Sequence, residues 1–182
     1  MNDPRKPVKS PALYFVAVVP DEPVRSQVEA FRQDLFQRFG TKVALKSPPH
    51  ITLLPPFHFE RSRENELQEA VSNAQKDLSP FEVELHDFDS FPRGVLFVAV
   101  KPQPQLEQLW EKVNAAFAEI PGFKAKHVHE KFHPHMTIGN RDWNEGGFAQ
   151  ARAEYAGKKF HAAFVVKEIS LLRLENGRWL VD

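Results

Sequence analysis

The hydrophobic positions of this chain follow two periods, one typical of strands and one of helices. Residues 14–19 form a run of aromatic and β-branched residues, which is typical of a buried strand. Between Asp21 and Phe39 the apolar residues recur every three or four positions, as on one face of a helix, and Gly40 follows as a stop signal. The same reasoning predicts three further helices, at 62–78, 105–120 and 148–156. It predicts further strands at 50–54, 81–85, 94–100, 135–138, 160–174 and 178–181. Two prolines close the strand at 50–54, and a Glu-Asn-Gly turn joins the last two strands.

The two halves of the chain repeat each other. Residues 14–20 read YFVAVVP and residues 96–102 read LFVAVKP, with five of seven positions identical. Further on, PHITL at 49–53 matches PHMTI at 134–138. Two matches in the same order and at nearly the same separation indicate an internal duplication.

The duplication predicts the architecture. Each half reads strand, helix, strand, helix, strand, so we expect an α+β fold of two pseudo-symmetric lobes around a central cleft. Each lobe would hold a small antiparallel or mixed sheet with helices outside. We expect residues 1–11 to be a flexible tail and 12–182 a single bilobal domain, with repeats at about 12–90 and 94–175 and a boundary near 90–93.

Composition narrows the class of protein. Of the 182 residues, 42% are hydrophobic and 26% are charged, which allows a sizeable core and excludes a disordered or fibrous chain. Lys+Arg and Asp+Glu both number 24, so the net charge of zero disfavours a broad basic face for long nucleic acid. The absence of cysteine excludes disulfides, thiolate catalysis and cysteine-ligated metals.

The sequence shows no targeting or membrane signal. The longest apolar run, Ala12–Val19, has eight residues, whereas a membrane-spanning helix needs about 20. The segment before it is interrupted by prolines and lacks the features of a signal peptide. We therefore expect a cytoplasmic protein with no membrane contact and no obligate protein partner.

A His-x-Thr motif occurs once in each repeat. His50 and Thr52 form the first copy, and His135 and Thr137 form the second. Alternate residues of a strand point to the same face, so each histidine can project beside its threonine. If a pseudo-twofold axis relates the lobes, both pairs meet in one cleft.

Two imidazoles and two hydroxyls suit phosphodiester chemistry. Opening a cyclic phosphate requires a base that activates water and an acid that protonates the departing sugar oxygen. Histidine, with an unperturbed pKa of about 6.5, can take either role near neutral pH. Threonine hydroxyls can donate to the non-bridging phosphate oxygens. This mechanism needs neither a metal nor a cofactor.

The paired motifs resemble those of the 2H phosphoesterase superfamily. HITL at 50–53 and HMTI at 135–138 match its His-x-Thr-x motifs, and PPHITLLPPF at 48–57 is similar to the bacterial 2′-5′ RNA ligase-like group. The resemblance covers about residues 12–175. It implies a bilobal fold and metal-independent action on RNA 2′,3′-cyclic phosphate ends or cyclic nucleotides. Family members open such rings, often to 2′-phosphates, and some join or cleave 2′-5′ linkages.

Carried over by position, the resemblance implies roles for individual residues. Two histidines become the acid and base, in an order that it leaves open, and two threonines become phosphate ligands. Many relatives carry arginine five residues after the second histidine, where this chain has Asn140, followed by Arg141. The candidate residues are His50 and His135 as catalytic groups, Thr52 and Thr137 as phosphate ligands, and Tyr14, Phe57 and Arg141 as possible substrate contacts.

Other interpretations of the sequence remain open. HEKFH at 129–133 matches the HExxH zinc motif, but Pro134 disfavours the helix on which that motif depends. A chance match in a histidine-rich loop, with incidental metal binding by His127, His129 and His133, fits better. The alternative functions are a non-catalytic module that binds RNA ends or nucleotides, and a 2′-5′ RNA ligase or 2′-5′ phosphodiesterase.

Overall fold

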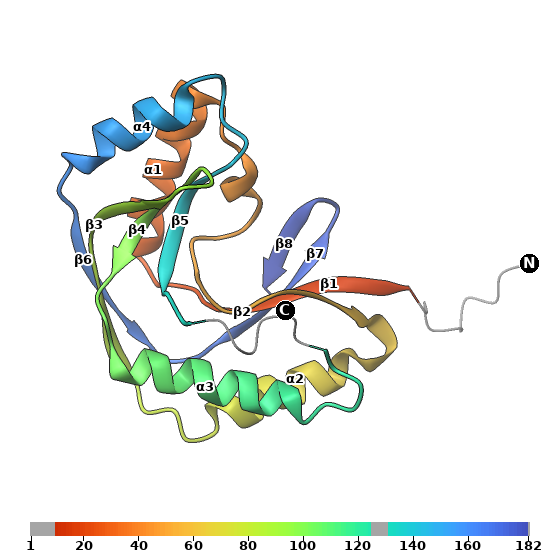
Figure 1. Ribbon diagram of the computed structural model, residues 1–182. Helices are drawn as coiled ribbons and strands as arrows, with labels where there is room; N and C mark the ends of the chain where they lie inside the picture. The colour runs from red at the N-terminus through yellow and green to blue at the C-terminus, as the bar shows by residue number, and fades with distance from the viewer. Residues whose placement is uncertain (1–9, 125–130, 182) are drawn as a thin grey trace, which may run out of the picture.

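A computed structural model describes residues 10–124 and 131–181 and arranges them as two four-stranded antiparallel sheets with helices outside (Figure 1). Sheet A has the strand order β2-β1-β7-β8, and sheet B has the order β5-β4-β3-β6. The expected α+β architecture is confirmed, and both sheets are antiparallel throughout. The strands are β1 (Pro11–Val18), β2 (Ile51–Glu60), β3 (Phe81–Phe91), β4 (Val95–Val100), β5 (His135–Asn140), β6 (His161–Val166), β7 (Ser170–Glu175) and β8 (Arg178–Val181).

Each sheet carries two of the α-helices. α2 (Glu64–Gln75) and α3 (Pro104–Ala118) pack against each other and against sheet A. α1 (Val24–Phe39) and α4 (Gly147–Ala156) pack against sheet B (Figure 1). We call sheet A with α2 and α3 lobe A, and sheet B with α1 and α4 lobe B. Two short 3-10 helices, η1 (Val43–Lys46) and η2 (Arg61–Arg63), lie on either side of β2 in the chain.

The lobes do not follow the two halves of the sequence. β3 belongs to the first half but lies in sheet B, whereas β7 and β8 belong to the second half and lie in sheet A. The expected boundary at 90–93 falls at the turn between β3 and β4. Antiparallel strands joined by a short turn pair as a hairpin, and Gly94, with a φ of 85°, accommodates that turn. The chain therefore crosses between the lobes several times.

Several element boundaries differ from the sequence prediction. α1 starts at Val24 rather than Asp21 and ends where Gly40 adopts the left-handed conformation. β2 continues through Pro55 and Pro56 to Glu60, although the prolines were expected to close it. β2 is an edge strand and its register with β1 is irregular at this point, so proline removes no required ladder hydrogen bond. The expected strand at 160–174 is two strands, β6 and β7, in different sheets.

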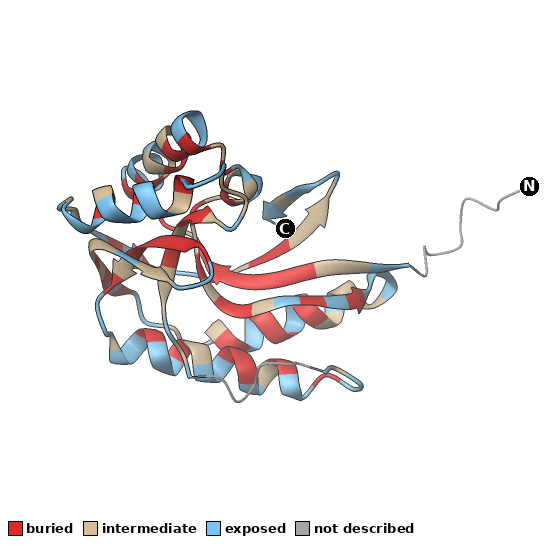
Figure 2. Ribbon diagram, turned by 45° about the horizontal axis from the view of Figure 1, so that its top comes forward, coloured by how far each residue is buried: buried red, intermediate tan, exposed pale blue. Residues whose placement is uncertain are grey.

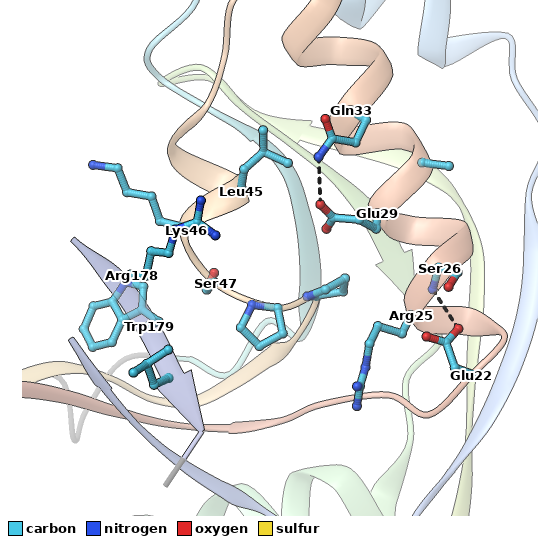
Figure 3. A pocket seen from close by; sticks show the side chains of 14 residues that line it. Glu22, Arg25, Ser26, Glu29, Gln33, Leu45, Lys46, Ser47, Arg178 and Trp179 are labelled. Carbon is cyan, nitrogen blue, oxygen red and sulfur yellow. Dashed lines mark hydrogen bonds between the residues drawn. The ribbon is translucent and has the colours of Figure 1, made fainter. Parts of the chain in front are cut away.

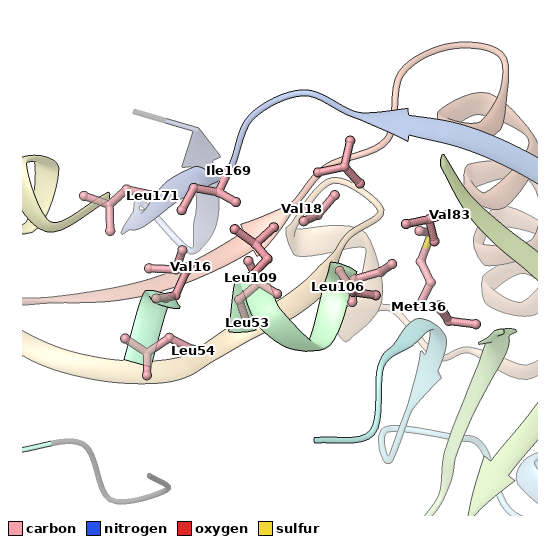
Figure 4. Packing of buried hydrophobic residues seen from close by; sticks show 14 of the residues in the cluster. Val16, Val18, Leu53, Leu54, Val83, Leu106, Leu109, Met136, Ile169 and Leu171 are labelled. Atoms are coloured by element: carbon pink, nitrogen blue, oxygen red, sulfur yellow. The ribbon is translucent and has the colours of Figure 1, made fainter. Parts of the chain in front are cut away.

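The core is shared by both lobes. One buried cluster includes residues of sheet A, α3 and sheet B, among them Leu106 of α3 and Val83 and Met136 of sheet B (Figure 4). Buried residues also follow β1 from Tyr14 to Val18 (Figure 2). On β1, Tyr14, Val16 and Val18 face this main core, whereas Phe15 and Ala17 face the opposite side with Leu172 and Trp179.

Two expectations concern the ends of the chain and membranes. Most of the expected flexible tail, residues 1–9, lies outside the described residues, and β1 already begins at Pro11. Within the described ranges, no helix has both the length and the apolar character that crossing a membrane requires.

Candidate active site

The strand register places His135, Thr137 and Thr52 on the faces of their sheets opposite the main core, and His50, one residue before β2, packs on Phe15 of the same face. In sheet B, Thr137 lies opposite Phe97 and His135 lies opposite Ala99. Met136, between them, points into the core and is fully buried. In sheet A, Thr52 lies opposite Ala17. Residues directly opposite on antiparallel strands share a face, so the motif side chains lie on the non-core faces of the two sheets.

The two motifs meet at a pocket between the lobes. Thr52 of lobe A and His135 of lobe B line one hollow of about 260 Å³. Burial is the main cause of the lowered pKa of His50, and the charge of His135 is a smaller one. The structure thus places one residue of each motif at the same pocket, whereas His50 and Thr137 do not line it. The full lining comprises Thr52, Leu53, Pro55, Phe91, Trp110, Asn114, Lys131, Phe132, His133 and His135.

Both histidines are oriented by the same backbone contact. The Nδ1 atom of His50 lies 2.7 Å from the carbonyl oxygen of Pro48, and Nδ1 of His135 lies 2.7 Å from that of His133. A carbonyl oxygen only accepts, so Nδ1 donates and carries the proton of each neutral ring. Nε2 is then the nitrogen with a free lone pair. No described group hydrogen-bonds to Nε2 of either histidine, which leaves it available to substrate.

A phenylalanine supports each imidazole. The ring of Phe15 lies 4.8 Å from that of His50, and the ring of Phe97 lies 5.0 Å from that of His135, both measured between centroids. Both are buried, and they occupy equivalent positions in the YFVAV and LFVAV repeats. Sequence analysis identified the repeat but assigned these residues no role. The occurrence of phenylalanine at the same position of both repeats could have identified them.

Burial and neighbouring charges favour the neutral form of both motif histidines. Burial lowers the pKa of His50 to about 4, and the guanidinium of Arg32 and the His135 ring act in the same direction. Burial also lowers the pKa of His135, with a smaller contribution from His133. Their backbone hydrogen bonds oppose both shifts only in part. Near neutral pH, Nε2 of each imidazole is therefore unprotonated and can accept a proton.

A buried arginine joins the two motifs. Arg32 of α1 is only 1% exposed. Its Nε donates to the carbonyl oxygen of Thr137 at 3.0 Å, and one terminal nitrogen donates to that of Ser47 at 2.7 Å. Ser47 lies three residues before His50, so one side chain fixes the backbone of both motifs. The other terminal nitrogen is buried with no described partner, and Glu29 lies 3.7 Å from the guanidinium.

An aspartate fixes the loop that leads to the first motif. Asp142, just beyond β5, accepts from the hydroxyl of Thr41 at 2.7 Å and from the backbone N–H groups of Lys42 and Val43 at 2.8 and 3.0 Å. Trp143, next in the chain, donates to the carbonyl of Gly94 at 2.7 Å. The end of the second motif's strand is thereby tied to the segment before His50. Sequence analysis assigned no role to Arg32 or Asp142.

Two of the expected substrate contacts lie in the core instead. Tyr14 is fully buried, and its hydroxyl donates to Glu64 at 2.7 Å. Phe57 lies opposite Tyr14 in the register and packs on Phe117 and Phe123. Both project from the face of sheet A opposite Phe15 and Thr52, because neighbouring residues of a strand alternate in direction. The structure therefore gives no support for substrate contact by either residue.

Two of the remaining sequence candidates lie on either side of β5, His133 before it and Arg141 after it. Arg141 is exposed, adopts a φ of 61°, and donates its backbone N–H to Gly94 at 2.8 Å. His133 is exposed at the rim of the Thr52–His135 pocket. His127, His129 and Glu130 of the HEKFH region lie outside the described residues, so the zinc and incidental-metal interpretations are untested. Within the described ranges, no cluster of three or more His, Cys, Asp or Glu side chains could hold a metal ion.

Comparison with known proteins gives one family and a common fold. The sequence model of the 2′-5′ RNA ligase superfamily matches residues 19–178. A protein of Geobacillus sp. (strain WCH70) named "Putative phosphoesterase" is 28% identical over 171 residues, covering 92% of each chain. A protein of the same name from Halalkalibacterium halodurans is 28% identical over 172 residues, covering 92% of this chain and 93% of the relative.

Solved structures show the same fold at lower identity. E. coli LigT, in its complex with 3′-AMP, superposes with a TM-score of 0.66 at 19% identity, covering 94% of each chain. A protein from Thermus thermophilus superposes with a TM-score of 0.64 at 19% identity, covering 93% of each chain. The two-lobed arrangement of this chain is therefore shared with LigT.

Proposed function

Because this chain belongs to the 2′-5′ RNA ligase superfamily, we propose that it is a phosphodiesterase that opens 2′,3′-cyclic phosphates by two-histidine acid–base catalysis. One observation carries the proposal. Each of two histidines, from opposite lobes, has Nδ1 committed to a backbone carbonyl and Nε2 free. A cyclic phosphate placed between them has one proton acceptor and, once the site is protonated, one proton donor.

The chemistry balances with these groups alone. Nε2 of the neutral histidine removes a proton from water as the water oxygen forms a bond to phosphorus. The bond from phosphorus to one ribose oxygen breaks, and the protonated histidine gives its proton to that oxygen. The hydroxyls of Thr52 and Thr137 donate to the non-bridging oxygens, where negative charge accumulates. The product is a nucleoside or RNA end that carries a 2′- or 3′-phosphate.

Electrostatics favours His50 as the base. Burial, with the charge of Arg32 as a smaller cause, lowers its pKa to about 4 and keeps it unprotonated at neutral pH. The arginine charge is not among the causes that lower the pKa of His135. A bound phosphate anion raises the pKa of a neighbouring imidazole, so His135 takes up the proton when substrate binds and acts as the acid.

The test is hydrolysis of the four 2′,3′-cyclic mononucleotides by purified protein, with and without EDTA. We expect turnover that resists EDTA, and resolving the 2′- and 3′-phosphate products shows which ester bond breaks. Turnover abolished by EDTA would contradict the metal-free mechanism and direct attention to the histidine-rich segment. Binding without product after long incubation would instead identify a nucleotide-binding module.

A further inference from the structure

A second pocket lies on the other side of the first motif, and we call it the β8 pocket. It has a volume of about 590 Å³ and lies between α1, the segment from η1 to β2, and β8 (Figure 3). Such a volume is typical of sites for small organic ligands. Among the residues that line it, the ones that bear on ligand binding are Arg25, Glu29, Lys46, Pro48, Arg178 and Trp179.

The β8 pocket adjoins the catalytic centre without containing it. None of the four motif residues lines it, and it shares no residue with the Thr52–His135 pocket. Pro48 lines the β8 pocket and also supplies the carbonyl that orients His50. On the other wall, the ring of Trp179 meets Phe15 edge-on at 4.6 Å between centroids, and Phe15 in turn packs on His50. A molecule bound between the histidines could therefore extend past His50 into the β8 pocket.

One side of the pocket offers an aromatic ring and two unpaired cations. Trp179 is half-buried and lies beside Lys46 and Arg178 (Figure 3). The side chains of Lys46 and Arg178 are exposed and make no hydrogen bond or ion pair with any described residue. Aromatic side chains stack on nucleobases and unpaired cations attract phosphates, which together are the features of single-stranded nucleic-acid sites.

The polar side chains on the opposite side of the pocket, from α1 and the residues just before it, already make hydrogen bonds within the protein. Glu22 accepts from the backbone N–H of Ser26 at 3.1 Å, and Glu29 accepts from the side chain of Gln33 at 3.2 Å. Arg25 donates to the carbonyl of Pro20 at 3.1 Å. An incoming phosphate is therefore directed to the β8 side, where the cations have no competing partner among the described residues.

We propose that the β8 pocket binds the nucleotide that precedes the cyclic-phosphate end of an RNA, with its base on Trp179 and its phosphate at Lys46 and Arg178. The inference rests on the proposed function and narrows its substrate class to RNA ends of two or more nucleotides. Recognition of one extra nucleotide by two cations also agrees with a chain of zero net charge, which has no surplus of basic residues for tracking long RNA.

The experiment compares kcat/KM for the dinucleotide ApA with a 2′,3′-cyclic phosphate end against kcat/KM for 2′,3′-cyclic AMP. The wild-type ratio should be about ten, within the range of roughly 5- to 150-fold that stacking of one base contributes. Trp179→Ala should lower this ratio about tenfold, and Trp179→Phe should restore most of it. The Lys46→Ala/Arg178→Ala double variant should lower the ratio at least threefold.

Lys42→Ala is the matched control. Lys42 is an exposed lysine four residues before Lys46 and does not line the pocket, so its loss should leave the ratio unchanged. Because each ratio uses the mononucleotide as its denominator, any effect of Trp179 substitutions on the packing around Phe15 cancels.

The outcomes separate this inference from the proposed function. A wild-type ratio near one, or a ratio that survives all of the pocket substitutions, would overturn the pocket assignment while leaving the phosphodiesterase intact. If neither substrate is hydrolysed, the proposed function fails, and calorimetric binding of ApA 3′-phosphate against 3′-AMP then decides on the pocket. Tighter binding of the dinucleotide that is lost in Arg178→Ala would support it, and equal binding would overturn it.

Discussion

Each motif histidine is positioned by the residues just before it in the chain. Both follow a proline, Pro49 and Pro134, and both donate from Nδ1 to the carbonyl two residues earlier. Proline fixes its own φ and holds the residue before it in an extended conformation. The carbonyl of that earlier residue is thus held in a set direction relative to the imidazole. The proline before each motif therefore helps to fix the tautomer in which Nδ1 of the histidine carries the proton.

Loss of either imidazole should strongly impair turnover. We expect His50→Ala and His135→Ala each to lower kcat by roughly 10²–10⁴-fold, the contribution of a positioned acid or base. The measurement is hydrolysis of 2′,3′-cyclic mononucleotides by variants whose circular dichroism matches that of the wild type. His58→Ala is the control, since His58 is exposed and lines neither pocket. Near-normal activity in both motif variants would refute the mechanism.

The acidic limit of activity should depend first on the burial of His50, which lowers its pKa most, and also on the charge of Arg32. Positive charge beside His50 disfavours its protonated form, so Arg32→Met should raise the pKa of His50 above its present value of about 4. A base must be unprotonated, so the acidic limb of the pH profile of kcat/KM should move to higher pH. Arg32→Lys keeps the charge but cannot donate to the carbonyls of both Thr137 and Ser47. It should therefore lower kcat with little shift of the acidic limb. An acidic limb that stays in place in Arg32→Met would contradict this role.

At the scale of elements, local pattern predicted most of the fold because period and stop signals act over short distances. α1 ends at the glycine that sequence analysis identified. The second His-x-Thr copy lies on β5, and the first lies on β2 except for His50, which comes one residue before that strand. The prolines in β2 were misleading, because a strand tolerates proline at a sheet edge and only the strand order reveals the edge. Strand partners are decided by distant residues, so the exchange of β3, β7 and β8 between lobes could not be predicted.

The candidate site was predicted only in part for the same reason. The motif residues could be identified because the His-x-Thr pattern occurs in both repeats. Arg32 could not be identified in this way, although it lies four residues after Val28 and three before Leu35, on the apolar side of α1. A charge in such a position costs free energy unless it is paired, which was a usable signal. Its partners, Ser47 and the strand of Thr137, become visible only in the folded structure.

A single methyl group on β5 should disturb the second motif. A Cβ at Gly139 would lie 2.3 Å from the ring of Trp143, which is itself held by its bond to Gly94. Gly139→Ala should therefore lower the free energy of unfolding by about 1–3 kcal/mol, as overpacking of a core does, and should reduce kcat by shifting His135. Urea denaturation measures the loss of stability.

Gly157→Ala is the matched control for this substitution. At Gly157 the added Cβ would meet only the carbonyl oxygen of Glu154, at 3.8 Å, which is ordinary van der Waals contact. The free energy of unfolding of this variant should stay within about 0.5 kcal/mol of the wild type. Equal destabilisation by the two substitutions would show that the clash with Trp143 is not the cause.

At the scale of the whole molecule, the two lobes should unfold together. The main core extends through both, and α1 in lobe B contacts the segment that leads into β2 of lobe A. Trp110 lies in lobe A and Trp143 follows β5 of lobe B. Tryptophan fluorescence and far-ultraviolet circular dichroism should therefore give one coincident urea transition. Two separate transitions would show that the lobes are independent.

The repeated crossing of the chain has a consequence for any attempt to divide the protein. A cut between β3 and β4 would leave one fragment with β1, β2 and β3 and another with β4 to β8. Each fragment would then own strands of both sheets and one of the two motifs, and the bond from Arg32 to the carbonyl of Thr137 would run from one fragment to the other. Co-expressed fragments would have to reassemble as an intertwined pair, in the manner of a strand-swapped dimer, and activity would report that complementation directly.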